Sequence, residues 1–285
     1  MKKNLLILAA VVVIGALGLT ACSGSNTTGQ TTDKGLTGSV VIAGSTSVQP
    51  LSEELVAAFT SKNPNATIEV QGGGSGVGIK AATDGVADIG ASSRDLKPEE
   101  KTGLTEYVIA KDGIALIINS SVKVTDLTLD QVKGIFTGQI TNWKEVGGDD
   151  KPITVVSREA GSGTRGAFIA ITGIEGKDAA GKTIDNTTEK AIVQPSTGAV
   201  MQTVANTPDA IGYTSIGALD NSVKTVTLAG IEPTEANIIN GTYKMSRPFI
   251  YMTKGMESEL TKAYLAFVLS AEGQAIVAKN YVSVI

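Results

Sequence analysis

The sequence predicts an α/β protein whose strands form mostly parallel sheets. Short apolar runs typical of buried strands alternate with segments in which apolar residues recur at helical spacing. The apolar runs end in polar loops rich in glycine, serine and threonine, and several of these loops lead directly into helices. Strands that alternate with helices imply a parallel sheet. About 250 residues follow the N-terminal leader and tether, which is enough for two α/β lobes or one large domain.

The N-terminal residues have the pattern of an export signal. Two lysines precede an apolar run over residues 5–19, and small residues stand before Cys22. The apolar run is short for a membrane-spanning helix. The four residues that end at Cys22 also resemble the cleavage motif of bacterial-type lipoproteins, in which the new N-terminal cysteine carries a lipid. We therefore expect a signal peptide over residues 1–21 and lipid attachment at Cys22. Simple cleavage near Ala21 is the alternative.

We predict that residues 22–37 form a flexible, lipid-anchored tether. Serine, threonine, glycine, asparagine and glutamine dominate this stretch, and they cannot bury enough apolar surface to offset the entropy of ordering. Cys22 is the single cysteine of the chain, so no intrachain disulfide can form. We expect the protein to be held by its lipid at the outer face of the cell membrane.

The composition excludes several classes of function. The chain has 24 basic and 28 acidic residues, and loss of the two lysines of the leader leaves 22 − 28 = −6. Such a charge offers no basic surface for nucleic acid. Because histidine is absent and the cysteine is destined for lipid, Ser-His triads, Cys-His pairs and histidine-based metal sites are excluded. We expect no catalytic residue, no metal and no cofactor, and we interpret residues 84–88 as a solvated turn.

In the first part of the chain, strand and helix patterns repeat. The predicted strands are 39–43, 67–70 and 87–91, with further strand-like runs at 107–109 and 114–118. Between them, Leu51, Leu55 and Phe59 recur at helical spacing. A second helix begins near Ile79, and Gly85 can end it.

The second part continues the pattern with one excursion. A helix begins at Thr128, which can form a capping box with Gln131. Its predicted buried stripe comprises Leu129, Val132, Ile135 and Phe136. We expect Trp143, which follows this helix in a loop, to be a packing anchor rather than a platform for a ligand. The polar residues 175–188 are interpreted as an excursion from the fold. Further strands are predicted at 153–156, 211–213, 223–228 and 249–252, and helices at 166–171, 197–205, 260–268 and 275–278.

Four loops share a chemistry of hydroxyl groups, glycine and arginine. They are Ser45-Thr46-Ser47, Gly74-Ser75-Gly76, Ser92-Ser93-Arg94, and Arg158 with Ser162-Gly163-Thr164. Three of them open helices, whose first backbone amides lack intrahelical partners and attract anions. In sheets of this kind, ligands bind outside the carboxyl ends of the strands. Four loops of donors at one edge predict a site for an oxyanion.

The loop over residues 157–165 offers the most donors. Ser162 is the predicted N-cap of the following helix, and flanking glycines let the backbone approach a ligand closely. Thr164 adds a hydroxyl, and Arg158 adds a fork of charged donors suited to an oxyanion. Taken alone, the loop could also be an ordinary capped helix start with a surface arginine.

Two rival phosphate motifs are not favoured. The glycine run over residues 72–78 lacks the Gly-Lys-Ser/Thr ending of an NTPase loop, so Lys80 is misplaced. Residues 76–81 fit a loose dinucleotide pattern, but a lone match is weak and an exported protein seldom meets that cofactor.

The order and spacing of the motifs resemble the phosphate-binding proteins that serve ABC phosphate importers. The resemblance is carried by Ala43-Gly44-Ser45-Thr46-Ser47, Gly74-Ser75-Gly76, Asp88-Ile89-Gly90-Ala91-Ser92-Ser93, Arg158-Glu159-Ala160-Gly161-Ser162-Gly163-Thr164 and Ala210-Ile211-Gly212-Tyr213. It runs from about Ser39 to the C-terminus. It implies a two-lobed periplasmic-binding-protein fold of type II, with phosphate held in the cleft. It also implies ligand contacts from Thr46, Ser47 and Ser75 in one lobe and from Arg158, Ser162, Gly163 and Thr164 in the other.

The resemblance also implies where the lobes lie. Lobe 1 would comprise residues 38–117 and 246–285, and lobe 2 residues 118–245. The chain would then cross between lobes twice, near Ile117 and near Arg247. Two crossover segments permit hinge closure.

One position departs from the family pattern. Where well-known members carry an aspartate after Ala-Ser, this chain has Ser93. A hydroxyl can accept the phosphate proton, but it can also donate to sulfate and imposes no like-charge penalty. Asp88, Asp95 and Glu159 are the acids near enough in sequence to replace that aspartate, although each could equally be a solvated or capping acid.

We therefore expect a monomeric, non-enzymatic receptor that captures inorganic phosphate outside the cell and delivers it to the permease subunits of an ABC importer. Ser45 and Ser93 would complete the phosphate site. Two alternatives stay open: a receptor for sulfate or another tetrahedral oxyanion, and a secreted phosphatase. The phosphatase would need a metal cluster or an activated nucleophile that the sequence does not offer. An adhesion or scaffold protein would give the hydroxyl loops no purpose.

Overall fold

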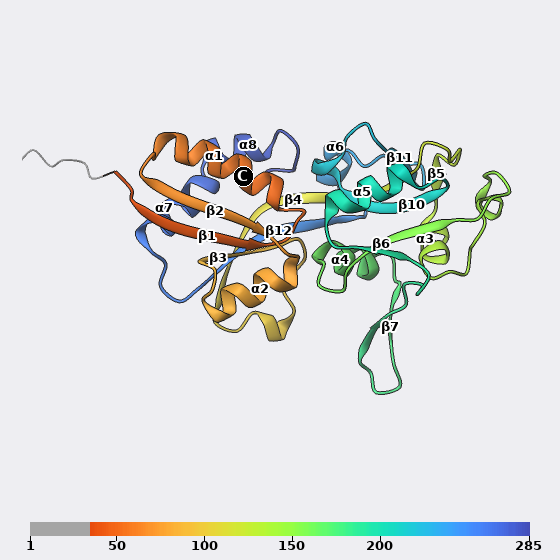
Figure 1. Ribbon diagram of the computed structural model, residues 1–285, viewed down its shortest axis with the longest axis horizontal. Coiled ribbons are helices and arrows are strands. Elements are labelled where there is room, and N and C mark those ends of the chain that lie inside the picture. The colour runs from red at the N-terminus through yellow and green to blue at the C-terminus, as the bar shows by residue number, and fades with distance from the viewer. Residues whose placement is uncertain (1–34) are drawn as a thin grey trace, which may run out of the picture. The chain divides into compact units, whose positions relative to one another are not determined.

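The computed structural model describes residues 35–285 (Figure 1). The predicted signal peptide, the lipid site Cys22 and the tether up to residue 34 lie outside the described residues.

A first region of the fold contains three parallel strands in the order β2-β1-β3. Its elements are β1 (Gly38–Gly44), α1 (Gln49–Lys62), β2 (Ala66–Gly72), α2 (Ser75–Asp84), β3 (Ile89–Ser92), α7 (Glu259–Val268) and α8 (Ala271–Val277). A short 3₁₀ turn, η1 (Pro98–Glu100), follows β3. The helical spacing of Leu51, Leu55 and Phe59 puts these side chains in one core with Ile42. The apolar face of α1 thus holds it against the sheet.

A second region is built on another sheet with its own helices. Its elements are β5 (Asp126–Leu127), α3 (Leu129–Phe136), η2 (Trp143–Val146), β6 (Thr154–Arg158), α4 (Gly163–Ile171), β7 (Glu175–Lys177), β8 (Thr183–Asp185), β9 (Ile192–Gln194), α5 (Thr197–Asn206), β10 (Ala210–Ser215), η3 (Ile216–Ala218), β11 (Lys224–Leu228) and α6 (Glu235–Ile239). Strands β10, β6 and β9 run parallel to one another. The predicted excursion is the β7–β8 hairpin, which projects from the second region in Figure 1.

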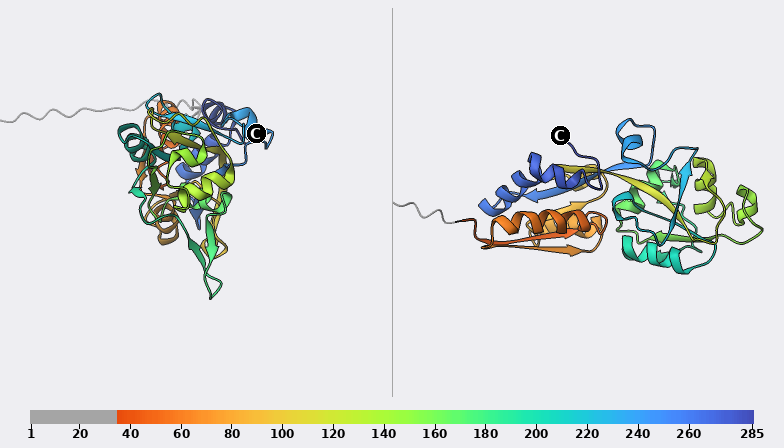
Figure 2. Two further views of the ribbon diagram at one scale, coloured as in Figure 1. Left: turned by 90° about the vertical axis from the view of Figure 1, so that its right-hand side faces the viewer. Right: turned by 90° about the horizontal axis from the view of Figure 1, so that it is seen from above.

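Two long strands, β4 (Leu104–Ile118) and β12 (Ser246–Lys254), connect the regions (Figures 1 and 2). β12 pairs antiparallel with β3 on one side and with residues 104–113 of β4 on the other. The rest of β4, from Ile114 to Ile118, pairs antiparallel with β10 in the second region. Each sheet is therefore mostly parallel, as predicted, and contains one strand that runs against the others: β12 in the first region and β4 in the second. The runs predicted at 107–109 and 114–118 are parts of this one strand.

Each sheet is covered by helices on both faces. Along β12, Phe249 and Tyr251 pack with α1 and α7, whereas Ile250 and Met252 pack with α2. This alternation is the two-residue period of a strand buried on both sides. In the second region, Val155 faces the core that contains α3 and α4, and its neighbour Val156 faces α5. The helices therefore leave the carboxyl ends of the strands uncovered, and the loops that follow the strands can meet there.

A buried ion pair joins the two connecting strands. Arg247 of β12 lies opposite Asp112 of β4, and its Nη2 donates to Asp112 Oδ2 at 2.9 Å. Ser215 of β10 donates its hydroxyl to Asp112 Oδ1 at 2.8 Å. Desolvation raises the pKa of Asp112, and the Arg247 guanidinium opposes that rise. This pair ties the two connecting strands to the second region.

Several local predictions are confirmed and two are corrected. Thr128 and Gln131 form the expected capping box, and Trp143 is buried as a packing anchor whose indole N–H donates to the Asp209 carbonyl. Leu129, in contrast, is exposed, because α3 begins at this residue and its core face is completed without it. Trp143 begins a 3₁₀ turn rather than lying in an irregular loop.

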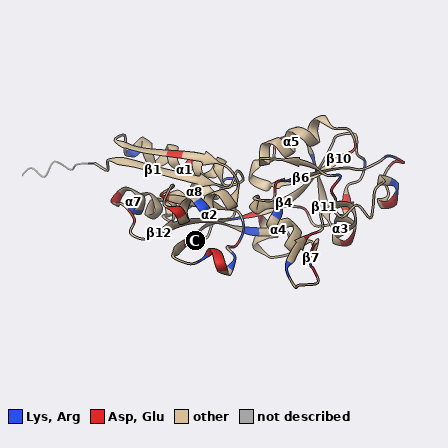
Figure 3. Ribbon diagram, turned by 60° about the horizontal axis from the view of Figure 1, so that its bottom comes forward, with Lys and Arg blue, Asp and Glu red and all other residues tan. Residues whose placement is uncertain are grey.

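Charged residues of both signs are interspersed in the view of Figure 3, where no basic face is seen. Within residues 35–285, no helix is long and apolar enough to cross a membrane.

Candidate functional site

The loop between β6 and α4 is built as the sequence predicts. Ser162 caps α4, and its hydroxyl accepts the backbone N–H of Arg165 at 3.2 Å. Among the described residues, no acceptor is found for the backbone amides of Gly163 and Thr164 in the first turn. Such amides, together with the helix dipole, favour an anion.

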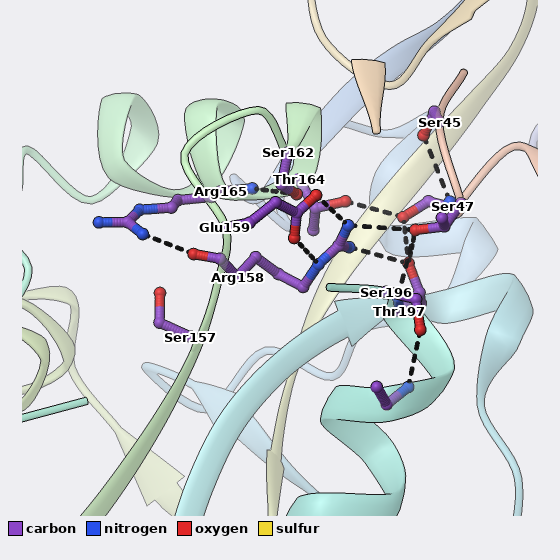
Figure 4. A network of polar contacts seen from close by, with 12 residues as sticks. Ser45, Ser47, Ser157, Arg158, Glu159, Ser162, Thr164, Arg165, Ser196 and Thr197 are labelled. Atoms are coloured by element: carbon purple, nitrogen blue, oxygen red, sulfur yellow. Dashed lines mark hydrogen bonds and ion pairs between the residues drawn. The ribbon is translucent and has the colours of Figure 1, made fainter. Parts of the chain in front are cut away.

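Arg158 is buried at the end of β6, with 2% of its surface exposed. The alternative of a surface arginine is therefore wrong. Its Nε and Nη2 each donate to a carboxylate oxygen of Glu159 at 2.8 Å (Figure 4). Nη2 also donates to Thr46 Oγ1 and Nη1 to Thr197 Oγ1, both at 3.1 Å. The guanidinium of Arg158 thus donates hydrogen bonds to hydroxyl groups of both regions.

The backbone of Arg158 is held by a tyrosine. Tyr213 of β10 accepts the Arg158 backbone N–H at 3.2 Å, and its hydroxyl lies 2.9 Å from Ser157 Oγ. Burial raises the pKa of Tyr213 to about 12, although these hydrogen bonds oppose the rise. The Tyr213 ring stacks on Phe168, so the end of β6 is anchored to the core.

The hydroxyls of the four predicted loops meet in two adjoining groups. In the first group, Ser45 donates to Ser93 Oγ at 2.8 Å, and Ser75 Oγ accepts the Ser93 backbone N–H at 3.0 Å. In the second, Ser47 Oγ lies 2.7 Å from Thr164 Oγ1 and 2.8 Å from Thr197 Oγ1. Convergence of this kind provides many neutral donors around one charged donor.

Glycines let the two regions touch at this point. A Cβ at Gly163 would overlap the Ser75 hydroxyl oxygen and lie 2.8 Å from Ser93 Oγ. The backbone N–H of Gly76 donates to the Gly161 carbonyl at 3.0 Å. Bare backbone is therefore required at Gly163, whereas a Cβ at Gly76 would lie at an ordinary contact distance, 3.5 Å, from the Gly161 carbonyl oxygen.

All nine predicted phosphate-site residues lie in this part of the molecule. They are Ser45, Thr46, Ser47, Ser75, Ser93, Arg158, Ser162, Gly163 and Thr164. The hydroxyl of Ser162 is used for capping α4. The predicted lipid site Cys22 lies outside the described residues.

One participant was not assigned from the sequence. Thr197 at the start of α5 contacts Arg158 and two hydroxyls of the first region. Of the three acids considered in place of the family aspartate, Glu159 reaches the cluster, where its carboxylate pairs with Arg158. Of the other acids considered, Asp88 accepts the Val41 backbone N–H at an exposed position, and Asp95 is exposed, so neither contacts the cluster.

The cluster holds no arrangement typical of catalysis by metal. Among the described residues, no group of three or more histidine, cysteine, aspartate or glutamate side chains is placed to hold a metal ion. Its chemistry is that of hydrogen-bond donation to an anion, with Glu159 as a nearby acceptor.

Comparison with known proteins gives one consistent family. Residues 25–272 match the model of the PBP superfamily domain. The phosphate-binding protein PstS of Bacillus subtilis is 34% identical over 96% of this chain and 91% of its own length. PstS of Borreliella burgdorferi is 32% identical over 84% of this chain and 87% of its own length.

Solved structures agree with the sequence comparison. A Clostridium perfringens protein assigned to a phosphate ABC transporter, crystallised with bound phosphate, has a TM-score of 0.82 and 47% identity, covering 87% of this chain and 100% of that one. An ABC-type phosphate transport receptor from Vibrio cholerae has a TM-score of 0.70 and 36% identity, covering 85% and 99%. The fold, the site and these relatives together show that this chain belongs to the PBP superfamily and, within it, to the PstS family of phosphate-binding proteins.

Proposed function

We propose that this protein binds inorganic phosphate outside the cell and delivers it to an ABC importer. The observation that carries the proposal is Arg158, a buried cation surrounded by hydroxyl groups from both regions of the fold. A buried charge needs a partner, and a small oxyanion can take over the hydrogen bond that Arg158 Nη2 now gives to Thr46. The PstS relatives are named as phosphate-binding proteins.

The donor set suits a tetrahedral oxyanion. Phosphate oxygens would accept from Arg158, from hydroxyls of the first region and from the amides of Gly163 and Thr164. The nine residues of the predicted site are our assignment for these contacts. At neutral pH phosphate keeps at least one proton, for which Ser93 or Glu159 offers an acceptor.

Binding is proposed to close two lobes around the ion. The assignment of residues 38–117 with 246–285 to one lobe, and of 118–245 to the other, is supported for most residues by two hydrophobic cores, although Ile114, Leu116 and Val282 of the first lobe pack in the core of the second. The crossovers near Ile117 and Arg247 lie on β4 and β12. Hinge motion at two connecting strands would then open and close the site.

The rest of the proposal concerns location and partners. Lipid at Cys22 would tether the protein, as a monomer, to the outer face of the membrane beside the permease subunits. The relatives are binding proteins of transporters, which supports a receptor without enzymatic activity.

Calorimetric titration with phosphate and then with sulfate tests this function. We expect saturable binding of phosphate with a stoichiometry near one, and weaker binding of sulfate. The sulfate alternative gains support from Ser93, because this position carries no repelling carboxylate. Tighter binding of sulfate than of phosphate would replace our proposal with that alternative.

A further inference from the structure

We propose that Thr197 is a positioning residue for Arg158, and that it links Arg158 to the hydroxyls of the first region. The inference rests on the proposed function, because it concerns how the same site holds its anion. Thr197 is the first residue of α5, and 3% of its surface is exposed.

Thr197 stands at the centre of the second hydroxyl group (Figure 4). Its Oγ1 accepts from Arg158 Nη1 at 3.1 Å and lies 2.8 Å from Ser47 Oγ and 3.2 Å from Thr46 Oγ1. Its backbone N–H donates to Thr46 Oγ1 at 3.2 Å. One side chain of the second region therefore contacts two of the three hydroxyls of the β1–α1 loop and the buried cation.

Counting donors and acceptors fixes the direction of these hydrogen bonds. Thr46 Oγ1 accepts from Arg158 Nη2 and from the Thr197 backbone, which fills both lone pairs of a hydroxyl. Thr46 must therefore donate its own hydrogen, and Thr197 Oγ1 is within reach. Thr197 Oγ1 then accepts from both Thr46 and Arg158, so it donates to Ser47. The orientation of this hydroxyl chain is set by Arg158.

The same contacts restrict the guanidinium. Glu159 takes the edge formed by Nε and Nη2, and Thr197 takes Nη1 at the other end of the fork. The guanidinium is planar by itself, and hydrogen bonds at both ends fix the orientation of its plane, so less freedom is lost when an anion binds. This is the physical role that we assign to Thr197.

Thr197 is not needed to begin α5. Ser196 is the N-cap, and its hydroxyl accepts the Ala199 backbone N–H at 3.1 Å. The contact of the Thr197 hydroxyl with Arg158 can therefore be removed without removing the helix cap. Ser196 provides a matched control one residue away.

The test compares Thr197→Val, which keeps the shape and removes the hydroxyl, with Thr197→Ser, which keeps the hydroxyl. Phosphate affinity is measured by calorimetry and the dissociation rate by stopped flow. We expect Thr197→Val to weaken binding about tenfold to a hundredfold, since a hydrogen bond to a charged group is lost. Thr197→Ser and the control Ser196→Ala should stay within about threefold of wild type, although Ser196→Ala should lower the melting temperature.

A double-mutant cycle separates positioning from general packing. In an Arg158→Lys background, which has no Nη1, Thr197→Val should weaken binding by less than about threefold. An equal loss in both backgrounds, a Thr197→Val protein within threefold of wild type, or equal losses in Ser196→Ala and Thr197→Val would each overturn the inference.

The outcome also distinguishes this inference from the proposed function. If wild type binds sulfate and not phosphate, the proposed function fails, and the same variants are compared with sulfate. If wild type binds neither anion, both proposals fail.

Discussion

Two buried arginines, Arg158 and Arg247, are handled in opposite ways in this molecule. Arg247 of β12 pairs with Asp112, its direct neighbour on the adjacent strand β4, and both side chains are 1% exposed. Arg158 pairs with the residue next to it in sequence, Glu159, whose side chain is 28% exposed, and donates to one hydroxyl of each region. The first arrangement pairs two fully buried charges with each other, whereas the second includes a hydrogen bond to Thr46 that a ligand can replace.

The difference separates a structural charge from a functional one. Breaking a buried ion pair leaves a charge without compensation, so the Asp112–Arg247 pair fixes the geometry of the connecting strands. A cation that also donates to a neutral hydroxyl, as Arg158 does to Thr46, can exchange that hydrogen bond for one to a stronger acceptor at moderate cost. Burial alone therefore does not identify the binding arginine, and the nature of its partners does.

The largest effect is expected from Asp112→Ala. Removing the carboxylate leaves Arg247 charged and buried, which should lower the free energy of unfolding by about 3 to 5 kcal/mol. Chemical denaturation of the variant measures this loss. The double variant Asp112→Leu with Arg247→Met should recover most of it, because apolar replacement of a whole buried pair is often near neutral. A double variant as unstable as the single one would show that the pair is not the cause.

Arg158→Ala should remove most phosphate affinity while changing stability less than Asp112→Ala does. Loss of a bidentate, charge-assisted donor should weaken binding at least about a hundredfold, as measured by calorimetry. Arg94→Ala is the control, since Arg94 pairs with Glu100 and makes no hydrogen bond to the hydroxyl cluster. Binding within threefold of wild type in Arg158→Ala would contradict the site assignment.

Alkaline pH should loosen the support of Arg158. Burial raises the pKa of Tyr213 to about 12 from its usual 10. A raised pKa in the folded state means that the stability from the neutral phenol is complete below pH 10 and is lost as pH rises toward 12. A pKa that differs by two between the folded and unfolded states corresponds to about 2.7 kcal/mol in the free energy of unfolding. Chemical denaturation at pH values from 9 to 12 should show this loss.

Tyr213→Phe provides the control for this pH dependence. The variant lacks the titrating group, so its stability should fall less steeply between pH 10 and 12. Tyr251, whose pKa burial also raises to about 12, remains in both proteins and accounts for part of the remaining slope. Identical slopes in wild type and variant would show that Tyr213 does not titrate in this range.

The smallest effect is expected at Ser93. Ser93→Asp should raise the ratio of phosphate to sulfate affinity by about tenfold, because a carboxylate accepts from protonated phosphate and repels sulfate. Competition of sulfate against bound phosphate between pH 6 and 8 measures this ratio, with Ser93→Asn as the uncharged control. If wild type already excludes sulfate more than a thousandfold and Ser93→Asp changes nothing, the discriminating acceptor lies elsewhere, with Glu159 the next candidate.

Local sequence patterns predicted most of the elements, because capping and periodicity act over a few residues. The cap at Ser162 and the capping box at Thr128 follow directly from this. The pairing of Asp112 with Arg247 could not be predicted, since it depends on the register of strands more than a hundred residues apart. Thr197 was missed although Ser196-Thr197-Gly198 resembles the other loops. The preceding strand β9 has three residues, so no apolar run indicated that this loop lies at the sheet edge.

The bare backbone between the regions also limits how the gene can change. Gly163 faces Ser75, and a Cβ at Gly163 would overlap the Ser75 hydroxyl oxygen, so there is no room for a side chain. Every missense change in a glycine codon introduces at least a methyl group. Gly163→Ala, the mildest of them, would act as a wedge between the halves, so variants at this codon should accumulate in a splayed form. A substitution at Gly163 is therefore a means of holding the protein in the splayed form, before it closes on its ligand.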